Sequence, residues 1–183
     1  MRRSLKWALI LAAAIILPGG GWIGYQIYRA TNPDLPAPLS RVAQVELLNT
    51  ADEKVRLGSL ERSGVPTIIS FWASWCAPCQ QEARAFGRLR RDYPAERLNI
   101  IYINADENDT PEKIAAFLAK AGNPALPVLR GGKSAFARIT GQNMIALPRT
   151  YLFDRDGKPT TVFTGYGGDA ERELREAVSA SAQ

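Results

Sequence analysis

The chain has 183 residues, of which 46% are hydrophobic, and its 23 Lys and Arg exceed its 18 Asp and Glu by a net charge of +5. This length suits one domain with an adequate core. Residues 1–29 hold four of the basic groups and no acid, so the rest of the chain carries only 5 − 4 = +1. The basic character therefore belongs to the N-terminal segment and does not indicate nucleic-acid binding.

Residues 1–29 are predicted to form a membrane anchor. Three basic residues precede the 22 uncharged residues Trp7–Tyr28. As a helix, this stretch would span about 33 Å, against a hydrocarbon core of about 30 Å. The basic flank predicts a cytoplasmic N-terminus and a C-terminal domain in the periplasm, with a single pass through a bacterial inner membrane. A cleaved signal peptide is the alternative, because Leu9–Leu17 has the length of its apolar region.

The next elements are predicted to be a linker and the first strands of the domain. Residues 30–40 contain three prolines and are predicted to be stiff and extended, which leaves residues 41–183 as the folded domain. The runs Val42–Leu48 and Lys54–Leu57 flank a polar turn and predict a hairpin. Val65–Ala73 is apolar and β-branched, as expected of a buried central strand.

The rest of the chain alternates helical and strand-like patterns. The predicted elements, in order, are a helix from Ala77 to about Asp92, a strand at Leu98–Asn104, a helix that starts at Thr110-Pro111 and ends at Gly122, a hairpin of Arg149–Asp154 with Pro159–Thr164, and a final helix capped by Asp169. Residues 131–142 fit either a helix or a loop.

Cys76 and Cys79 are the only cysteines of the chain and lie between the predicted central strand and the helix that follows it. Pro78 fits the first turn of a helix, where its missing N–H removes no hydrogen bond, so the helix is predicted to begin near Ala77. The unpaired N–H groups and the helix dipole would then favour the thiolate of Cys76 and lower its pKa. We expect an exposed Cys76 to attack a substrate disulfide and the more covered Cys79 to resolve the mixed disulfide.

Three other roles for the cysteine pair are less consistent with the sequence. A structural disulfide closing so small a loop would restrict the unfolded chain little. Zinc needs about four ligands, and the chain offers two cysteines and no histidine. Covalent haem attachment needs a histidine where Gln80 stands. No metal and no cofactor is therefore expected.

The segment Ile68–Cys79, IISFWASWCAPC, followed by Gln80-Gln81-Glu82, resembles the active-site segment of the membrane-anchored TlpA/ResA-type thiol:disulfide oxidoreductases, a branch of the thioredoxin-like family. A second block, Leu147–Lys158, resembles the segment that carries a cis-proline facing the two cysteines, here Pro148. The resemblance covers about residues 41–180. It implies an α/β thioredoxin fold with a mixed central sheet flanked by helices, extended here by an N-terminal β-hairpin and the single anchor.

Glu82 is the strongest further candidate for a catalytic residue. Cys79, Glu82, Phe86 and Leu89 recur at helical spacing, so Glu82 shares an apolar face one turn beyond Cys79. Partial burial would raise the pKa of this carboxyl and allow it to exchange a proton with Cys79. The resemblance supports this role and would explain why Ser70 stands where cytosolic thioredoxins carry a buried Asp. The alternative is an ordinary acid in the first turn of a helix.

The resemblance also suggests which residues contact a substrate. Pro148 would offer a backbone edge to an extended peptide, unless it is a plain proline at the start of a strand. Arg149 replaces a common threonine; it either meets the cysteine thiolate or an acidic partner, or is a solvated surface residue. Trp72 is assigned to the core and Trp75 to the rim of the site. The predicted substrate contacts are Trp75, Ala77, Pro78, Leu147 and Arg149.

The resemblance implies a reductant that acts on protein disulfides in cytochrome c maturation or copper-site assembly. It also implies electrons from a membrane donor of the DsbD/CcdA kind. A disulfide oxidase or isomerase is the first alternative, although the absence of a histidine between the cysteines favours reduction. A Cu(I)-binding module without turnover is the second. A peroxidase is disfavoured because Ala73 stands where such sites place a threonine.

Overall fold

The computed structural model describes residues 34–122, 124–143 and 146–181. The predicted anchor lies outside them, and no helix among the described residues is long and apolar enough to cross a membrane. The folded unit begins at Leu35, earlier than the predicted boundary at residue 41. The prediction of an extended linker up to residue 40 is wrong at its end, because Leu39 joins a hydrophobic core cluster and its amide donates to the carbonyl of Gly157 at 2.9 Å.

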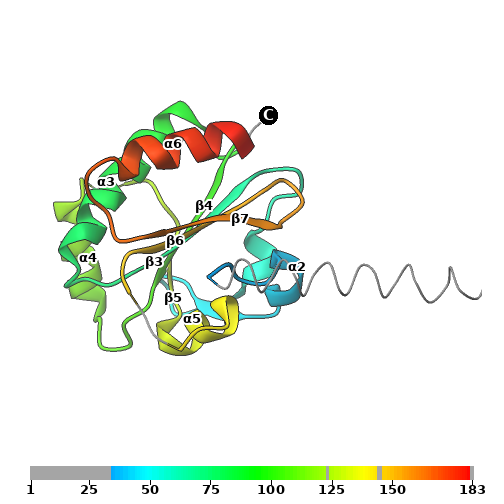
Figure 1. Ribbon diagram of the computed structural model, residues 1–183. Helices are drawn as coiled ribbons and strands as arrows, with labels where there is room; N and C mark the ends of the chain where they lie inside the picture. The colour runs from blue at the N-terminus through cyan, green and yellow to red at the C-terminus, as the bar shows by residue number, and fades with distance from the viewer. Residues whose placement is uncertain (1–33, 123, 144–145, 182–183) are drawn as a thin grey trace, which may run out of the picture. The chain divides into compact units, whose positions relative to one another are not determined.

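A mixed seven-stranded sheet with the order β2-β1-β5-β4-β3-β6-β7 forms the centre of the domain (Figure 1). Strands β3, β4 and β5 run parallel to one another, whereas β6 pairs antiparallel with β3 and β7 pairs antiparallel with β6. The β1–β2 hairpin extends the other edge, since β1 pairs antiparallel with β5. The strands are β1 (Glu46–Leu48), β2 (Lys54–Arg56), β3 (Thr67–Trp72), β4 (Asn99–Asn104), β5 (Val128–Arg130), β6 (Arg149–Phe153) and β7 (Pro159–Thr164).

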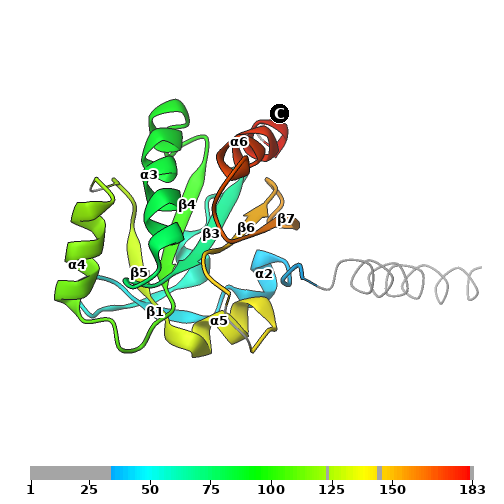
Figure 2. The same ribbon diagram turned by 60° about the vertical axis from the view of Figure 1, so that its left-hand side comes forward.

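Helices cover both faces of the sheet (Figures 1 and 2). Helices α3, α4 and α6 bury their apolar residues in one core cluster, and α2, α5 and the short 3-10 helix η1 contribute to a second cluster on the opposite face. The three central strands supply alternate residues to the two clusters, because successive side chains of a strand point to opposite faces. The helices are α2 (Leu39–Val42), η1 (Leu57–Leu60), α3 (Ala77–Asp92), α4 (Pro111–Lys120), α5 (Gly132–Thr140) and α6 (Ala170–Ser181).

The predicted thioredoxin fold with its N-terminal hairpin is confirmed, with two local corrections and a decision between two open alternatives. The first strand begins at Glu46 rather than Val42, because Val42 ends the short helix α2. The three-residue strand β5 was not predicted. Residues 131–142, left open between helix and loop, contain α5, which ends at Gly141 in the left-handed conformation with φ +73°.

The redox segment starts from a rigid part of the sheet. Trp72, the last residue of β3, is fully buried, as predicted for a core residue. Its ring stacks on Tyr102 with centroids 4.9 Å apart and on Phe117 at 4.3 Å. Because aromatic stacking adds to the gain from burial, the end of β3 is held firmly where the chain turns into the cysteine pair.

Candidate active site

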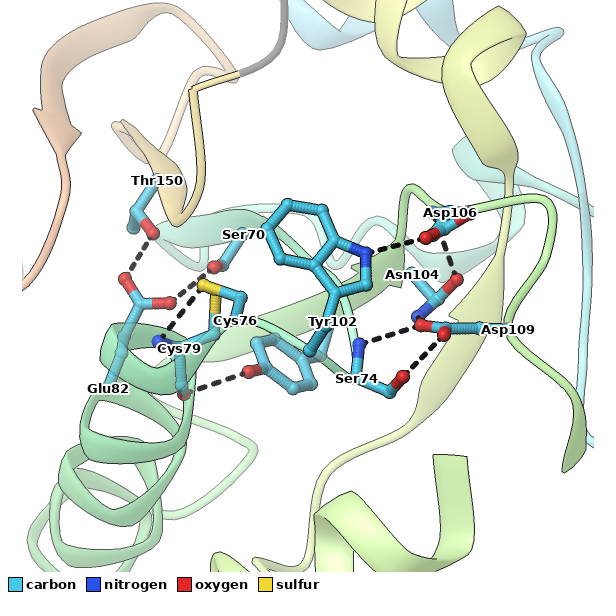
Figure 3. Close-up of a disulfide and its surroundings, with 11 residues drawn as sticks. Ser70, Ser74, Cys76, Cys79, Glu82, Tyr102, Asn104, Asp106, Asp109 and Thr150 are labelled. Atoms are coloured by element: carbon cyan, nitrogen blue, oxygen red, sulfur yellow. Dashed lines mark hydrogen bonds between the residues drawn. A yellow bond between two sulfur atoms is a disulfide. The ribbon is translucent and has the colours of Figure 1, made fainter. Parts of the chain in front are cut away.

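Cys76 and Cys79 form a disulfide at the start of α3, with Cα atoms 5.3 Å apart (Figure 3). Cys76 is the N-cap residue of α3, and its sulfur accepts a hydrogen bond from the amide of Cys79 at 3.3 Å. Pro78 lies in the first turn, and the helix begins at Ala77 as predicted. The same amide of Cys79 would also donate to the sulfur of a Cys76 thiolate.

The predicted exposure of Cys76 is wrong for the disulfide form. Cys76 is only 3% exposed and Cys79 is fully buried. Both cysteines belong to the core cluster beneath α3 and α4, because the Cys76 sulfur turns inward to its partner. The surface above them is formed by neighbouring residues: Ala77 is exposed, Pro78 is half-buried and Trp75 is 68% exposed.

Glu82 lies on the buried face of α3, one turn beyond Cys79, and is 2% exposed. Its carboxylate accepts hydrogen bonds from Thr150 Oγ1 at 2.5 Å and Ser70 Oγ at 2.8 Å (Figure 3). Burial raises the pKa of Glu82 to about 7, and the two hydroxyl donors offset only part of that rise. Thus a carboxyl group on the same buried face of α3 as Cys79 has a pKa near neutral pH.

Ser70 and Thr150 hold the carboxylate of Glu82 from two neighbouring strands. Ser70 on β3 and Thr150 on β6 are Cα partners across the sheet, and both are fully buried. Together they hold the two oxygens of Glu82. The sequence marks Ser70 only as a departure from cytosolic thioredoxins and predicts no role for Thr150, which lies on β6 two residues after Pro148.

Tyr102 holds the first turn of α3 from below. Its hydroxyl donates to the carbonyl oxygen of Cys79 at 3.3 Å. Burial, with a smaller contribution from the negative charge of Glu82, raises the pKa of Tyr102 well above 10.0, so the phenol keeps its proton. The sequence marked Tyr102 only as part of a strand.

Trp75 is held in place at the surface by Asp106. The indole Nε1 donates to Asp106 Oδ2 at 2.6 Å. The pKa of Asp106 is lowered, first by the backbone amide of Asn108 and then by this indole donor. The position of Trp75 on the rim agrees with its exposure, and its contact with a substrate stays a prediction.

The segment before β6 packs against the core cluster to which the cysteines belong. The Leu147–Pro148 peptide bond is cis, as the resemblance implied. Pro148 is buried, and the half-buried Leu147 packs against the cluster that contains Cys76 and Cys79.

Arg149 is neither a solvated surface residue nor directed toward Cys76, whereas its contact with an acidic partner stays a prediction. Arg149 is 9% exposed, so it is not a solvated surface residue. Its guanidinium donates to Tyr151 Oη at 3.2 Å and to Thr164 Oγ1. Tyr151 belongs to the cluster on the face opposite α3, so the side chain of Arg149 points away from the side of the sheet that carries Cys76.

Comparison with known proteins assigns the chemistry of this site. Thioredoxin-like protein YneN of Bacillus subtilis is 26% identical over 93% of this chain and 96% of its own length. Thiol-disulfide oxidoreductase ResA of Geobacillus kaustophilus is 26% identical over 91% of this chain and 94% of its own. The fold matches a thiol:disulfide interchange protein of the thioredoxin family from Chlorobium tepidum, with a TM-score of 0.61 and 19% identity over 82% of this chain and 97% of that one.

These relatives and the disulfide at the start of α3 define the class of protein: it is a thiol–disulfide oxidoreductase with a thioredoxin fold. Residues 38–160 match the AhpC/TSA family, and the chain belongs to it. Among the described residues, no group of three or more His, Cys, Asp and Glu is placed to hold a metal ion.

Proposed function

We propose that this protein is a membrane-tethered reductant of protein disulfides that works in the periplasm. The observation that supports the exchange chemistry is the buried Glu82, whose pKa of about 7 suits it to take the proton of a resolving thiol. The oxidase and the isomerase use the same chemistry, and the reduction potential distinguishes them.

The proposed reaction has two exchange steps. The Cys76 thiolate attacks one sulfur of a substrate disulfide, which forms a mixed disulfide and releases the other substrate sulfur as a thiolate. Glu82 accepts the proton of the Cys79 thiol, and the resulting thiolate attacks the Cys76 sulfur. This step closes the Cys76–Cys79 disulfide and releases the second substrate sulfur. The substrate gains two electrons, and the protein ends in the disulfide form.

The proposed partners follow from the relatives and from the N-terminal segment. We propose substrates in cytochrome c maturation or copper-site assembly, as the resemblance of the redox segment to the TlpA/ResA-type branch implies. A membrane reductant of the DsbD/CcdA kind would then reopen the disulfide. An anchor in residues 1–29 would raise the effective concentration of the domain near such a donor.

Trapping of mixed disulfides tests this proposal. In the full chain, Cys79→Ala is expected to leave substrates covalently joined to Cys76, whereas the double variant Cys76→Ala/Cys79→Ala, as the matched control, is expected to capture nothing. A reduction potential of about −270 mV would support a reductant, whereas one of about −120 mV would indicate an oxidant. Tight binding of Cu(I) without reduction of insulin disulfides would favour the copper-binding module.

Membrane fractionation tests the location separately. The full chain is expected to stay with the inner membrane through a carbonate wash, because a spanning helix resists extraction. Recovery of a shortened protein in the soluble periplasmic fraction would contradict the tether and favour a cleaved signal peptide.

A further inference from the structure

A buried carboxylate lies on the other side of the redox segment from Glu82 and takes no part in the proton transfer described above. Asp109, in the loop between β4 and α4, is 6% exposed. Asp109 Oδ2 accepts from the backbone amide of Ser74 at 2.7 Å and from Asn104 Nδ2 at 2.7 Å. Asp109 Oδ1 accepts from the Ser74 hydroxyl (Figure 3). Three donors thus satisfy a carboxylate that is almost completely removed from water.

Ser74 lies in the turn that connects β3 to the cysteine pair. The turn is closed by a hydrogen bond from the Cys76 amide to the Ala73 carbonyl at 3.1 Å. Asp109 adds two bonds to Ser74, one of them to its backbone. The turn before Cys76 is therefore held by its own backbone hydrogen bond and by two bonds to Asp109 in the loop after β4.

The residues that hold Asp109 belong to regular secondary structure or to its ends. Asn104 is the last residue of β4 and is 1% exposed, and its side-chain oxygen also accepts from the Asp106 amide at 3.1 Å. The next residue after Asp109 is Thr110, whose hydroxyl caps α4 by accepting from the Lys113 amide. A sheet strand and a helix start therefore both hold Asp109 in position.

We propose that Asp109 is a positioning residue for disulfide exchange: it holds the Ser74 turn so that the Cys76 sulfur stays at the N-terminus of α3 when the disulfide is open. In the disulfide form the bond to Cys79 fixes Cys76 covalently. In the dithiol form that constraint is gone, and the turn depends on its hydrogen bonds. Since small displacements of a reacting group strongly slow a reaction, Asp109 keeps Cys76 reactive. This inference rests on the exchange chemistry of the preceding section.

Asp109→Asn is the matched substitution that tests this role. It keeps the shape of the side chain, and its amide oxygen can replace Oδ2 as the acceptor for the Ser74 amide and Asn104 Nδ2. It removes the negative charge that strengthens all three bonds, and its NH2 group cannot accept from the Ser74 hydroxyl. Ser74→Ala removes only the hydroxyl bond. Asp92→Asn is the control. Asp92 is exposed, is the last residue of α3 and pairs with Arg175, so it lies far from the cysteines at the N-terminus of this helix.

The measurements are the single-turnover rate constant for attack of the reduced protein on a model disulfide, the rate of alkylation of Cys76, and urea unfolding. We expect Asp109→Asn to slow the attack by about tenfold and Ser74→Ala by about threefold. Asp92→Asn should match the wild type. Slower attack in a variant that unfolds at the wild-type urea concentration separates positioning from a loss of overall stability.

Two results would overturn the inference. One is a folded Asp109→Asn protein that attacks and alkylates at the wild-type rate. The other applies if Asp109→Asn does not fold, in which case wild-type rates for Ser74→Ala would overturn it. A wild-type protein that fails to reduce the model disulfide would instead contradict the exchange function itself, so the two failures are distinguishable.

Discussion

Replacing Glu82 by glutamine is expected to stabilise the oxidised protein at pH 8 and to change it little at pH 4. The folded protein raises the pKa of Glu82 from 4.5 to about 7, mainly through burial. Between these values the folded state binds more protons than the unfolded state, so stability falls as the pH rises. At about 1.4 kcal/mol per pKa unit, the loss of free energy of unfolding is about 3–4 kcal/mol, and it is complete above the folded pKa. Glutamine carries no charge at any pH, so the Glu82→Gln protein does not lose this free energy of unfolding as the pH rises.

The oxidised protein makes this measurement clean. Neither cysteine titrates in a disulfide, and the chain contains no histidine. The glutamine amide can still bond to Ser70 and Thr150, because a hydroxyl either donates or accepts. The free energy of unfolding in urea, followed by circular dichroism from pH 4 to 8, should therefore decline for the wild type and remain nearly level for Glu82→Gln over the same range.

Glu96→Gln is the matched control, because Glu96 is exposed. The free energy of unfolding of the Glu96→Gln protein should show the same pH dependence as that of the wild type. Parallel curves for Glu82→Gln and the wild type between pH 5 and 8 would refute the reasoning, since they would show that the buried carboxyl does not titrate in this range.

Two further sets of substitutions test the surroundings. Thr150→Val and Ser70→Ala each remove a donor that lowers the pKa of Glu82, so both should move the midpoint of the stability–pH curve upward, and a downward shift would contradict the assignment. Gly131→Ala should destabilise the fold by about 1–3 kcal/mol, because a Cβ there would lie 2.6 Å from Ala135 Cβ and 2.8 Å from Leu47 Cδ2. Gly167→Ala, where a Cβ meets nothing within 4 Å, should change the free energy of unfolding in urea by less than about 0.5 kcal/mol; equal effects at the two glycines would contradict the packing argument.

Local features of the sequence predicted much of the site, whereas contacts between distant segments could not be predicted. The proline two residues into the redox motif located the start of α3, and helical spacing located Glu82 on its buried face. Thr150 is 68 residues from Glu82, and Asp109 is 35 residues from Ser74. Such contacts depend on which strands become neighbours, which one sequence does not reveal.

Short or alternating elements account for the other errors. Strand β5 has three residues, too few for a period-2 pattern to be distinct. One alternative for Arg149 was a contact with the cysteine thiolate, but successive residues of a strand point to opposite faces. The same alternation that directs Thr150 toward Glu82 directs Arg149 to the other side of the sheet.

The burial of the two cysteines restricts the shape of any protein that exchanges electrons with this one. A flat partner surface would meet the exposed Trp75 and Ala77 before it reached Cys76, which is only 3% exposed. An incoming thiol must therefore stand on a narrow, protruding loop or chain end, or arrive as a small molecule. The shape of the surface around Cys76 would therefore select among electron donors in addition to any difference in their reduction potentials.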